Sequence, residues 1–158
     1  MAAQQAETSP PIDPAWLKFD AASRTATFPL TAGLTPINGA LNFNGYDDGQ
    51  LVFTVPTAWT VNVAFFNHDG MLPHSAEIIP DSLPVPVSSV SPAVSRAYTD
   101  QLDQGVPPQG KSSMNFTAGP TGQYFIFCGV PGHGRAGMWI RFVVSATAEV
   151  PSIALYKR

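Results

Sequence analysis

Apolar and polar residues alternate along most of this chain, and this alternation is its main structural signal. In the segment QLVFTVP, for example, Leu51, Phe53 and Val55 fall together on one face. A period of two residues is that of a β-strand with one buried face. The segments with this period are rich in β-branched and aromatic residues, and we expect a strand in each of them: 25–30, 39–45, 50–56, 59–67, 74–79, 112–118, 122–128 and 138–145.

Short segments rich in glycine, proline, asparagine and aspartate separate these strands. Examples are NGYDDG, NHDG, AGPTG and PGHGRAG, whose residue types favour tight turns. Many short strands joined by such turns, without a long helical pattern, predict an all-β protein, either a sandwich or a barrel. The exception is a long loop excursion at about 81–110, where prolines cluster and where we expect one short helical turn near 95–102. Loops of this length are often functional or mobile.

The chain has the length and apolar content of one domain. Its 158 residues, 44% of them apolar, are enough to bury a full hydrophobic core. We expect a single domain over 15–148. The polar, proline-bearing residues 1–14 are expected to form a flexible N-terminal tail, and 149–158 a C-terminal tail.

The charge of the chain is low and mildly acidic, which excludes some classes of partner. Charged side chains make up 12% of the residues, the formal net charge is −3, and no basic stripe is present. Binding to nucleic acid, or steering to an anionic membrane surface, is therefore not expected. No apolar run approaches the roughly 20 residues of a membrane span, and the first residues lack the pattern of a signal peptide. An export signal or membrane anchor upstream of this sequence is a hypothesis.

The single cysteine lies in the segment FCGVPGHGRAGM, with the spacing Cys128-x4-His133-x4-Met138. Most of the residues between these three are small or proline, so we expect a tight loop that brings the thiol, imidazole and thioether together. One cysteine excludes an intramolecular disulfide and a four-cysteine metal site. Copper sites for electron transfer use two imidazoles and a thiolate in a trigonal plane, with a weak axial thioether. The loop therefore predicts three of the four ligands of a mononuclear copper site.

The second imidazole must come from His68 or His74, which are the other histidines of the chain. His74 opens an expected strand and would lie at the same end of a sandwich as the Cys128 loop. His68 lies in the turn NHDG, whose residue types prefer solvent. The pattern favours His74 as the ligand and a solvated turn position for His68.

Other chemistries for the cysteine fit the pattern less well. A nucleophilic cysteine needs an activating base and often a third residue that orients this base, and no such residue stands out. A zinc site could use the two histidines and Cys128, but it would leave Met138 unexplained. A buried, inert thiol in a metal-free β-sandwich binding module stays open.

The ligand-bearing segments resemble those of the cupredoxins, the small blue copper proteins. FCGVPGHGRAGM resembles their copper-binding loop, and LPHSAEII resembles the segment that carries the first copper histidine. The likeness is closest to the sulfocyanins, with the rusticyanins next, and covers roughly residues 20–147. It implies a Greek-key β-sandwich with one type 1 copper ion bound by His74, Cys128, His133 and Met138.

The resemblance also implies which groups surround these ligands. Many cupredoxins have an asparagine directly after the first histidine, where its amide helps to tie the two ligand segments together, but this chain has Ser75. The hydrogen bonds around the copper and the reduction potential therefore depend on a smaller hydroxyl. We also expect the backbone N–H groups of Gly129 and Val130 to point at the Cys128 sulfur.

By this resemblance the protein is a one-electron carrier that cycles between Cu(II) and Cu(I), and not an enzyme. We expect it to be monomeric and extracytoplasmic, in the periplasm or at the outer face of the cell membrane, as part of a respiratory chain. Its partners would be redox proteins, such as a cytochrome or a terminal oxidase, that dock near His133. A copper carrier or storage protein is the alternative that uses the same ligands.

Overall fold

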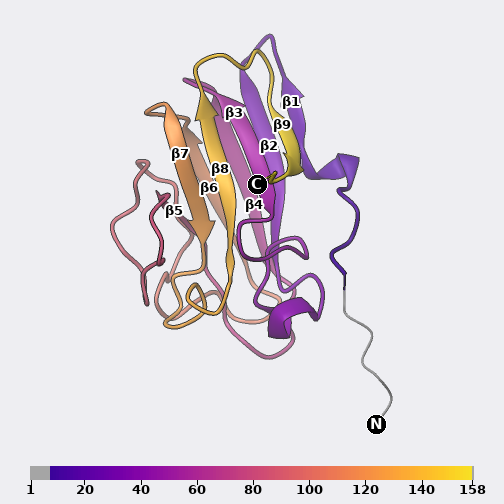
Figure 1. The fold of residues 1–158 in the computed structure, drawn as a ribbon, viewed down its shortest axis with the longest axis vertical. Helices are drawn as coiled ribbons and strands as arrows, with labels where there is room; N and C mark the ends of the chain where they lie inside the picture. Colours follow the sequence, from indigo (N-terminus) through magenta and orange to yellow (C-terminus); the bar gives the residue numbers. More distant parts are fainter. Residues whose placement is uncertain (1–7, 158) are drawn as a thin grey trace.

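Two mixed β-sheets face each other in the computed structural model, which describes residues 8–157 (Figure 1). The first sheet has the strand order β1-β2-β4-β6, with the bounds Lys18–Asp20, Thr25–Ala32, Thr60–Asn67 and Lys111–Thr117. The second has the order β5-β7-β8-β3-β9, with the bounds Glu77–Pro80, Gly122–Phe127, Trp139–Ser145, Leu51–Pro56 and Ser152–Leu155. The pairs β2–β4 and β3–β8 are parallel, and the others are antiparallel. Two 3-10 turns complete the elements: η1 (Pro14–Trp16) and η2 (Ile37–Ala40).

The core lies between the two sheets and is built from the alternating apolar residues. Leu51, Phe53 and Val55 of β3 are fully buried, as their spacing predicts. Phe28 of the first sheet stacks on Phe53 of the second with ring centroids 4.2 Å apart. Because each sheet presents one apolar face, packing the two faces together removes both from water. The prediction of an all-β sandwich is confirmed.

One expected strand is absent. The segment 39–45 forms part of η2 and a tight turn, in which Asn44 has a positive φ of 53°. The side chains here hydrogen-bond to backbone groups in place of a strand ladder. The Asn42 side-chain amide donates to the Ile37 backbone carbonyl at 2.8 Å, and the side-chain Oδ1 of Asn44 accepts from the Thr31 N–H at 2.6 Å.

Both expected tails contain ordered structure. Residues 149–158 include β9, which pairs with β3, so the prediction of a C-terminal tail is wrong. The guanidinium of Arg141 also lies 3.6 Å from the centre of the Tyr156 ring and holds the chain end against the sheet. Of the expected N-terminal tail, residues 1–7 lie outside the described part. Within the rest, Ile12 packs against the core and the Pro10 carbonyl accepts a hydrogen bond from Tyr46.

Strand register brings several distant segments to one end of the sandwich. Phe127, the last residue of β7, pairs with Glu77 at the start of β5 and with Trp139 at the start of β8. The loops that precede Glu77 and follow Phe127 therefore meet, at the lower end of the molecule in Figure 1. The long excursion at 81–110 is present between β5 and β6. The structure has no helix near 95–102, where turns, bends and the isolated bridge of Tyr98 with Glu77 occur instead. Within residues 8–157, no helix is long and apolar enough to cross a bilayer.

Candidate metal centre

Three metal-binding side chains meet at this end of the sandwich. One ring nitrogen of His74, one ring nitrogen of His133 and the sulfur of Cys128 all lie within 4.8 Å of one another. The Cys128 Sγ is 4.0 Å from His74 Nδ1 and 3.6 Å from His133 Nδ1. At metal–ligand distances of about 2.0–2.3 Å, three donors in a trigonal plane are about 3.7 Å apart. The separation of these atoms therefore fits one metal ion among them.

The loop from Cys128 to Met138 is closed by its own backbone. The Cys128 N–H donates to the Met138 carbonyl, and the Met138 N–H donates to the His133 carbonyl, both at 3.1 Å. Gly132 has a φ of +84°, a left-handed conformation that suits glycine. Gly134 is also required for space, because a Cβ there would lie 2.5 Å from the Phe127 ring. The small residues thus fold the loop tightly enough to bring the backbones of Cys128, His133 and Met138 together, and the Met138 side chain is fully buried.

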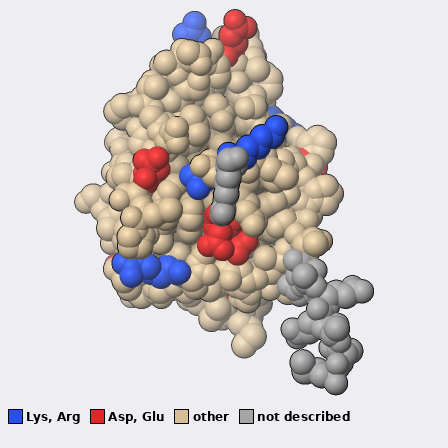
Figure 2. Space-filling model, in the orientation of Figure 1, with Lys and Arg blue, Asp and Glu red and all other residues tan. Residues whose placement is uncertain are grey.

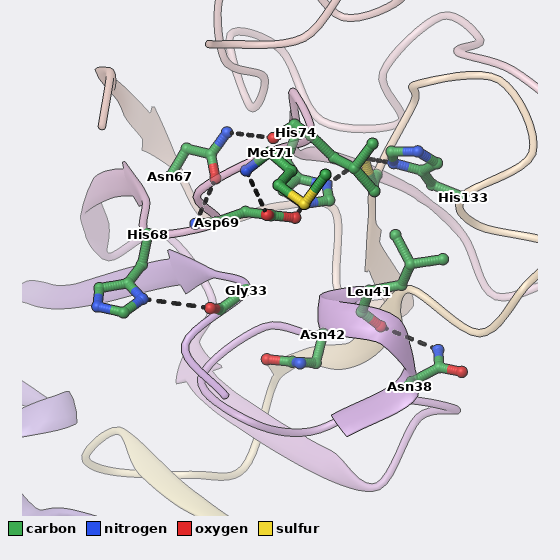
Figure 3. A network of polar contacts seen from close by, with 12 residues as sticks. Gly33, Asn38, Leu41, Asn42, Asn67, His68, Asp69, Met71, His74 and His133 are labelled. Carbon is green, nitrogen blue, oxygen red and sulfur yellow. Dashed lines mark hydrogen bonds and ion pairs between the residues drawn. The ribbon is translucent and has the colours of Figure 1, made fainter. Parts of the chain in front are cut away.

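His74 comes from the other side of the site and is fully buried. The sequence predicted that His74 opens a strand, but it lies outside the strands of the structure. Instead it pairs with Val106 in an isolated bridge, whose two hydrogen bonds are 3.2 and 2.7 Å long. Its Nε2 lies 2.7 Å from the Asp69 carboxylate (Figure 3). Its Nδ1 lies 4.0 Å from the Cys128 sulfur. Each of the two ring nitrogens therefore has a separate neighbour.

Ser75 joins the two ligand segments. Its backbone N–H donates to the Cys128 sulfur at 3.4 Å, and its hydroxyl donates to the Leu102 carbonyl at 2.7 Å. The same hydroxyl accepts the Gly129 N–H at 3.0 Å. The expectation that the Gly129 N–H points at the sulfur is therefore wrong, because the Ser75 hydroxyl accepts it. A serine performs here the tying role that an asparagine amide would fill.

The pKa values in the metal-free site follow from burial. Burial raises the pKa of the Cys128 thiol to about 11, although the Ser75 and Val130 N–H groups act to lower it. Burial lowers the pKa of His74 despite the nearby Asp69 carboxylate, and it lowers the pKa of His133 in the same way. Both imidazoles are thus neutral at pH 7 and can each offer a lone pair, whereas the thiol needs a metal ion to displace its proton.

The excursion at 81–110 covers the ligand loop. The Val87 carbonyl accepts the Gly132 N–H at 2.7 Å, and the Ser89 N–H donates to the Gly129 carbonyl at 3.1 Å. Farther along, Gly105 lies close to the His74 backbone. A Cβ placed on Gly105 would be only 2.9 Å from the backbone nitrogen of His74. The long loop therefore braces both ligand segments, which is a role that its residue types did not reveal.

Two polar residues of the site were not predicted, namely Asp69 and Asn67. Both lie in the turn NHDG, where the sequence draws attention to His68 instead. His68 itself is exposed, and its Nδ1 lies 3.4 Å from the Gly33 carbonyl, away from the other two histidines (Figure 3). Its predicted place in a solvated turn is confirmed. An acidic residue a few positions before a candidate ligand histidine was the available signal for Asp69.

Comparison with known proteins identifies the family. The family model described as the sulfocyanin (SoxE) domain matches residues 14–155. The chain belongs to this family. Sulfocyanin of Sulfolobus acidocaldarius is 34% identical over 122 residues, which cover 70% of this chain and 58% of that protein. Rusticyanin of Acidithiobacillus ferrooxidans is 30% identical over 105 residues, which cover 65% of this chain and 54% of that protein. The resemblance to sulfocyanins and rusticyanins is thereby confirmed.

Solved structures show the same fold. A rusticyanin structure, described as that of a copper protein, superposes with a TM-score of 0.57 at 26% identity and covers 83% of this chain and 88% of that one. Auracyanin A of Chloroflexus aurantiacus, described as a "blue" copper protein, gives a TM-score of 0.55 at 18% identity and covers 77% of this chain and 99% of that one. The fold of this sulfocyanin-family chain is therefore that of the cupredoxins. The chain spans just over half the length of the curated relatives it matches.

Proposed function

We propose that this protein is a type 1 copper protein that carries single electrons, with Cys128, His74, His133 and Met138 as the ligands. The observation that carries this proposal is the trio of donor atoms within 4.8 Å of one another, one thiol and two imidazoles, each imidazole presenting Nδ1 to the sulfur. Copper bound by such a set supplies a one-electron couple, Cu(II)/Cu(I). Transfer of one electron to and from the copper ion needs no substrate bound at the metal. We therefore do not expect the protein to be an enzyme.

Met138 is proposed as the weak axial ligand. Its side chain is fully buried, and its backbone is hydrogen-bonded to both Cys128 and His133. A thioether is a soft donor that suits copper and has little affinity for zinc. The donor set as a whole therefore favours copper over zinc.

The surroundings of the ligands favour rapid electron transfer without large movement. Phe127 and Trp139, which close β7 and open β8, are buried, and Cys128 has no exposed surface. Backbone hydrogen bonds fix the ligand loop, and Ser75 ties this loop to His74. A dry site with fixed ligands changes little between oxidation states, and exclusion of water acts on the potential of the metal.

The test is a spectrum of the protein loaded with one equivalent of Cu(II). We expect an intense thiolate-to-copper charge-transfer band in the visible range, lost in Cys128→Ser and bleached reversibly by a mild reductant. An ordinary nitrogen- and oxygen-ligated copper signal in electron paramagnetic resonance would contradict the proposal. A charge-transfer band accompanied by rapid loss of copper to a chelator would instead favour a copper carrier.

We propose that redox partners dock on the surface formed by Met71, Leu72 and Pro73. These residues directly precede His74, and the first two are 86% and 39% exposed. Gly105 packs between Pro73 and Val130 of the ligand loop. A Cβ placed on Gly105 would lie within 3 Å of both residues. Charged residues make up only 12% of the chain, and most of the face seen in Figure 2 is uncharged. A small apolar contact of this kind suits brief redox encounters.

The location of the protein in the cell is also proposed. Membership of the sulfocyanin family supports an extracytoplasmic position, at the outer face of the membrane or in the periplasm. The electron donor and acceptor would then be respiratory proteins that are accessible from that side. Fractionation of the native cells, with the protein followed by antibody, tests this location, and recovery in the cytosolic fraction would contradict it.

A further inference from the structure

A buried carboxylate contacts the His74 imidazole on the side opposite the sulfur. Asp69 Oδ2 lies 2.7 Å from His74 Nε2, and the two side chains are 8% and 0% exposed. Since Nδ1 faces Cys128, the nitrogen that contacts Asp69 is the one that would not bind the metal. A carboxylate accepts hydrogen bonds only, so this contact requires the proton of the neutral ring to be on Nε2. The lone pair of the ring is then on Nδ1.

Asp69 is held in this position by the turn that contains it. Its second oxygen, Oδ1, accepts the Met71 N–H at 2.9 Å, and its own N–H donates to Asn67 Oδ1 at 2.9 Å. The Asp69 Cβ packs against Gly33. A Cβ placed on Gly33 would lie only 2.9 Å from the Asp69 Cβ. The Asp69 side chain therefore has little room to adopt another rotamer.

Asn67 connects this turn to the strand-like segment beside His74. Its amide donates to the Leu72 carbonyl at 2.9 Å and to the Val106 carbonyl at 2.8 Å. Val106 is also the residue that pairs with the His74 backbone. The carboxylate and the imidazole are thus both anchored to the same backbone, which fixes the distance between them.

A purely structural role for Asp69, as a cap of its turn, would need only one of its oxygens. The Met71 N–H already satisfies that role through Oδ1. The other oxygen is directed at His74, as Figure 3 shows. Hydrogen-bonding partners of this type fix the tautomer and raise the basicity of metal-bound histidines in other proteins.

We propose that Asp69 is a positioning residue of the copper centre. It holds His74 in the tautomer that presents Nδ1 to the metal, and its negative charge favours Cu(II) over Cu(I), which lowers the reduction potential. This inference rests on the proposed copper function. A neutral acceptor at the same place would leave the fold intact but give a higher potential.

The test compares Asp69→Asn with Asp20→Asn, which removes the same charge from an exposed position in β1. We expect Asp69→Asn to weaken Cu(II) binding about tenfold relative to Cu(I). That change corresponds to a rise in reduction potential of about 59 mV, with the charge-transfer band retained. Asp20→Asn should leave the potential unchanged. Equal potentials in the two variants would overturn the proposal.

A second readout needs no copper. In the metal-free protein, nitrogen-15 NMR of histidine should show His74 protonated on Nε2, and Asp69→Asn should shift or remove this N–H signal. A native His74 protonated on Nδ1 would overturn the proposal as well. A copper-loaded native protein without the charge-transfer band would contradict the proposed copper function. The NMR measurement would still establish the tautomer of His74, so the two failures can be told apart.

Discussion

The two histidines of the site approach the same sulfur from different surroundings. His74 is fully buried, its backbone is paired with Val106, and its second nitrogen contacts Asp69. His133 is only partly buried, lies in a loop of small residues, and makes no hydrogen bond through its second nitrogen within residues 8–157. The rings are nevertheless only 5.1 Å apart.

We propose that this difference reflects a division of roles in the proposed copper centre. In this proposal the His74 side fixes the geometry of the site, and its Asp69 carboxylate acts on the potential. The His133 side would bring one ligand close to the surface, where an electron could enter or leave.

The largest expected effect comes from removing each imidazole in turn. His74→Ala leaves the buried Asp69 carboxylate without its partner, so the free energy of unfolding of the metal-free protein should fall by about 3 kcal/mol. His133→Ala removes no such partner, and its effect should stay below about 1 kcal/mol. Urea denaturation of the two variants measures both values. Equal losses would mean that the two sides do not differ in rigidity.

A smaller effect is expected at the proposed docking surface. Met71→Lys places a charge beside the site. Electron exchange with a redox partner such as a cytochrome should slow about tenfold, because the apolar contact is lost. Val150→Lys, at an exposed apolar position beyond the far end of β8, is the matched control. Stopped-flow kinetics on copper-loaded protein measures the rates. Identical rates in both variants would place docking elsewhere.

A further effect concerns pH and lies on the His74 side, at Glu77. Burial raises the pKa of this fully buried carboxyl from 4.5 to about 7, and the nearby Asp103 acts in the same direction, against the Val90 N–H that donates to Oε1 at 2.9 Å. The folded protein therefore keeps this proton at pH values where the unfolded chain has lost it. The contribution of Glu77 to stability is complete below about pH 4.5 and is lost as the pH rises through about 7.

Glu77→Gln should remove this part of the pH dependence. The neutral amide can still accept the Val90 N–H but does not ionise, so the variant should lose less stability than the native protein between pH 4.5 and 7. Denaturation at a series of pH values, with both proteins in the same copper-loaded state, measures the difference. Parallel curves would show that Glu77 does not set the pH dependence.

Local patterns predicted the parts of the molecule that depend on neighbours in sequence. The alternation of Leu51, Phe53 and Val55 predicted a buried face, because a strand sends alternate residues to opposite sides. The spacing of Cys128 and His133 predicted that their donor atoms lie close together, because a short loop of small residues cannot separate them, and these atoms are 3.6 Å apart.

Contacts between segments far apart in sequence were not predictable in the same way. Asp69 reads as an ordinary turn residue until the fold brings it against His74. The hydroxyl of Ser75 bridges Leu102 and Gly129, which lie 27 and 54 positions away. β9 was missed since its four residues, three of them exposed, carry too weak a pattern to be distinguished from a tail.

A crystal structure of the copper-loaded protein would show directly which atoms bind the metal. We expect one copper ion bound by the Sγ of Cys128 and the Nδ1 atoms of His74 and His133, with the Met138 sulfur farther away and the Asp69 carboxylate still on His74 Nε2. Copper bound through His68, or through Nε2 of His74 with Asp69 displaced, would contradict it.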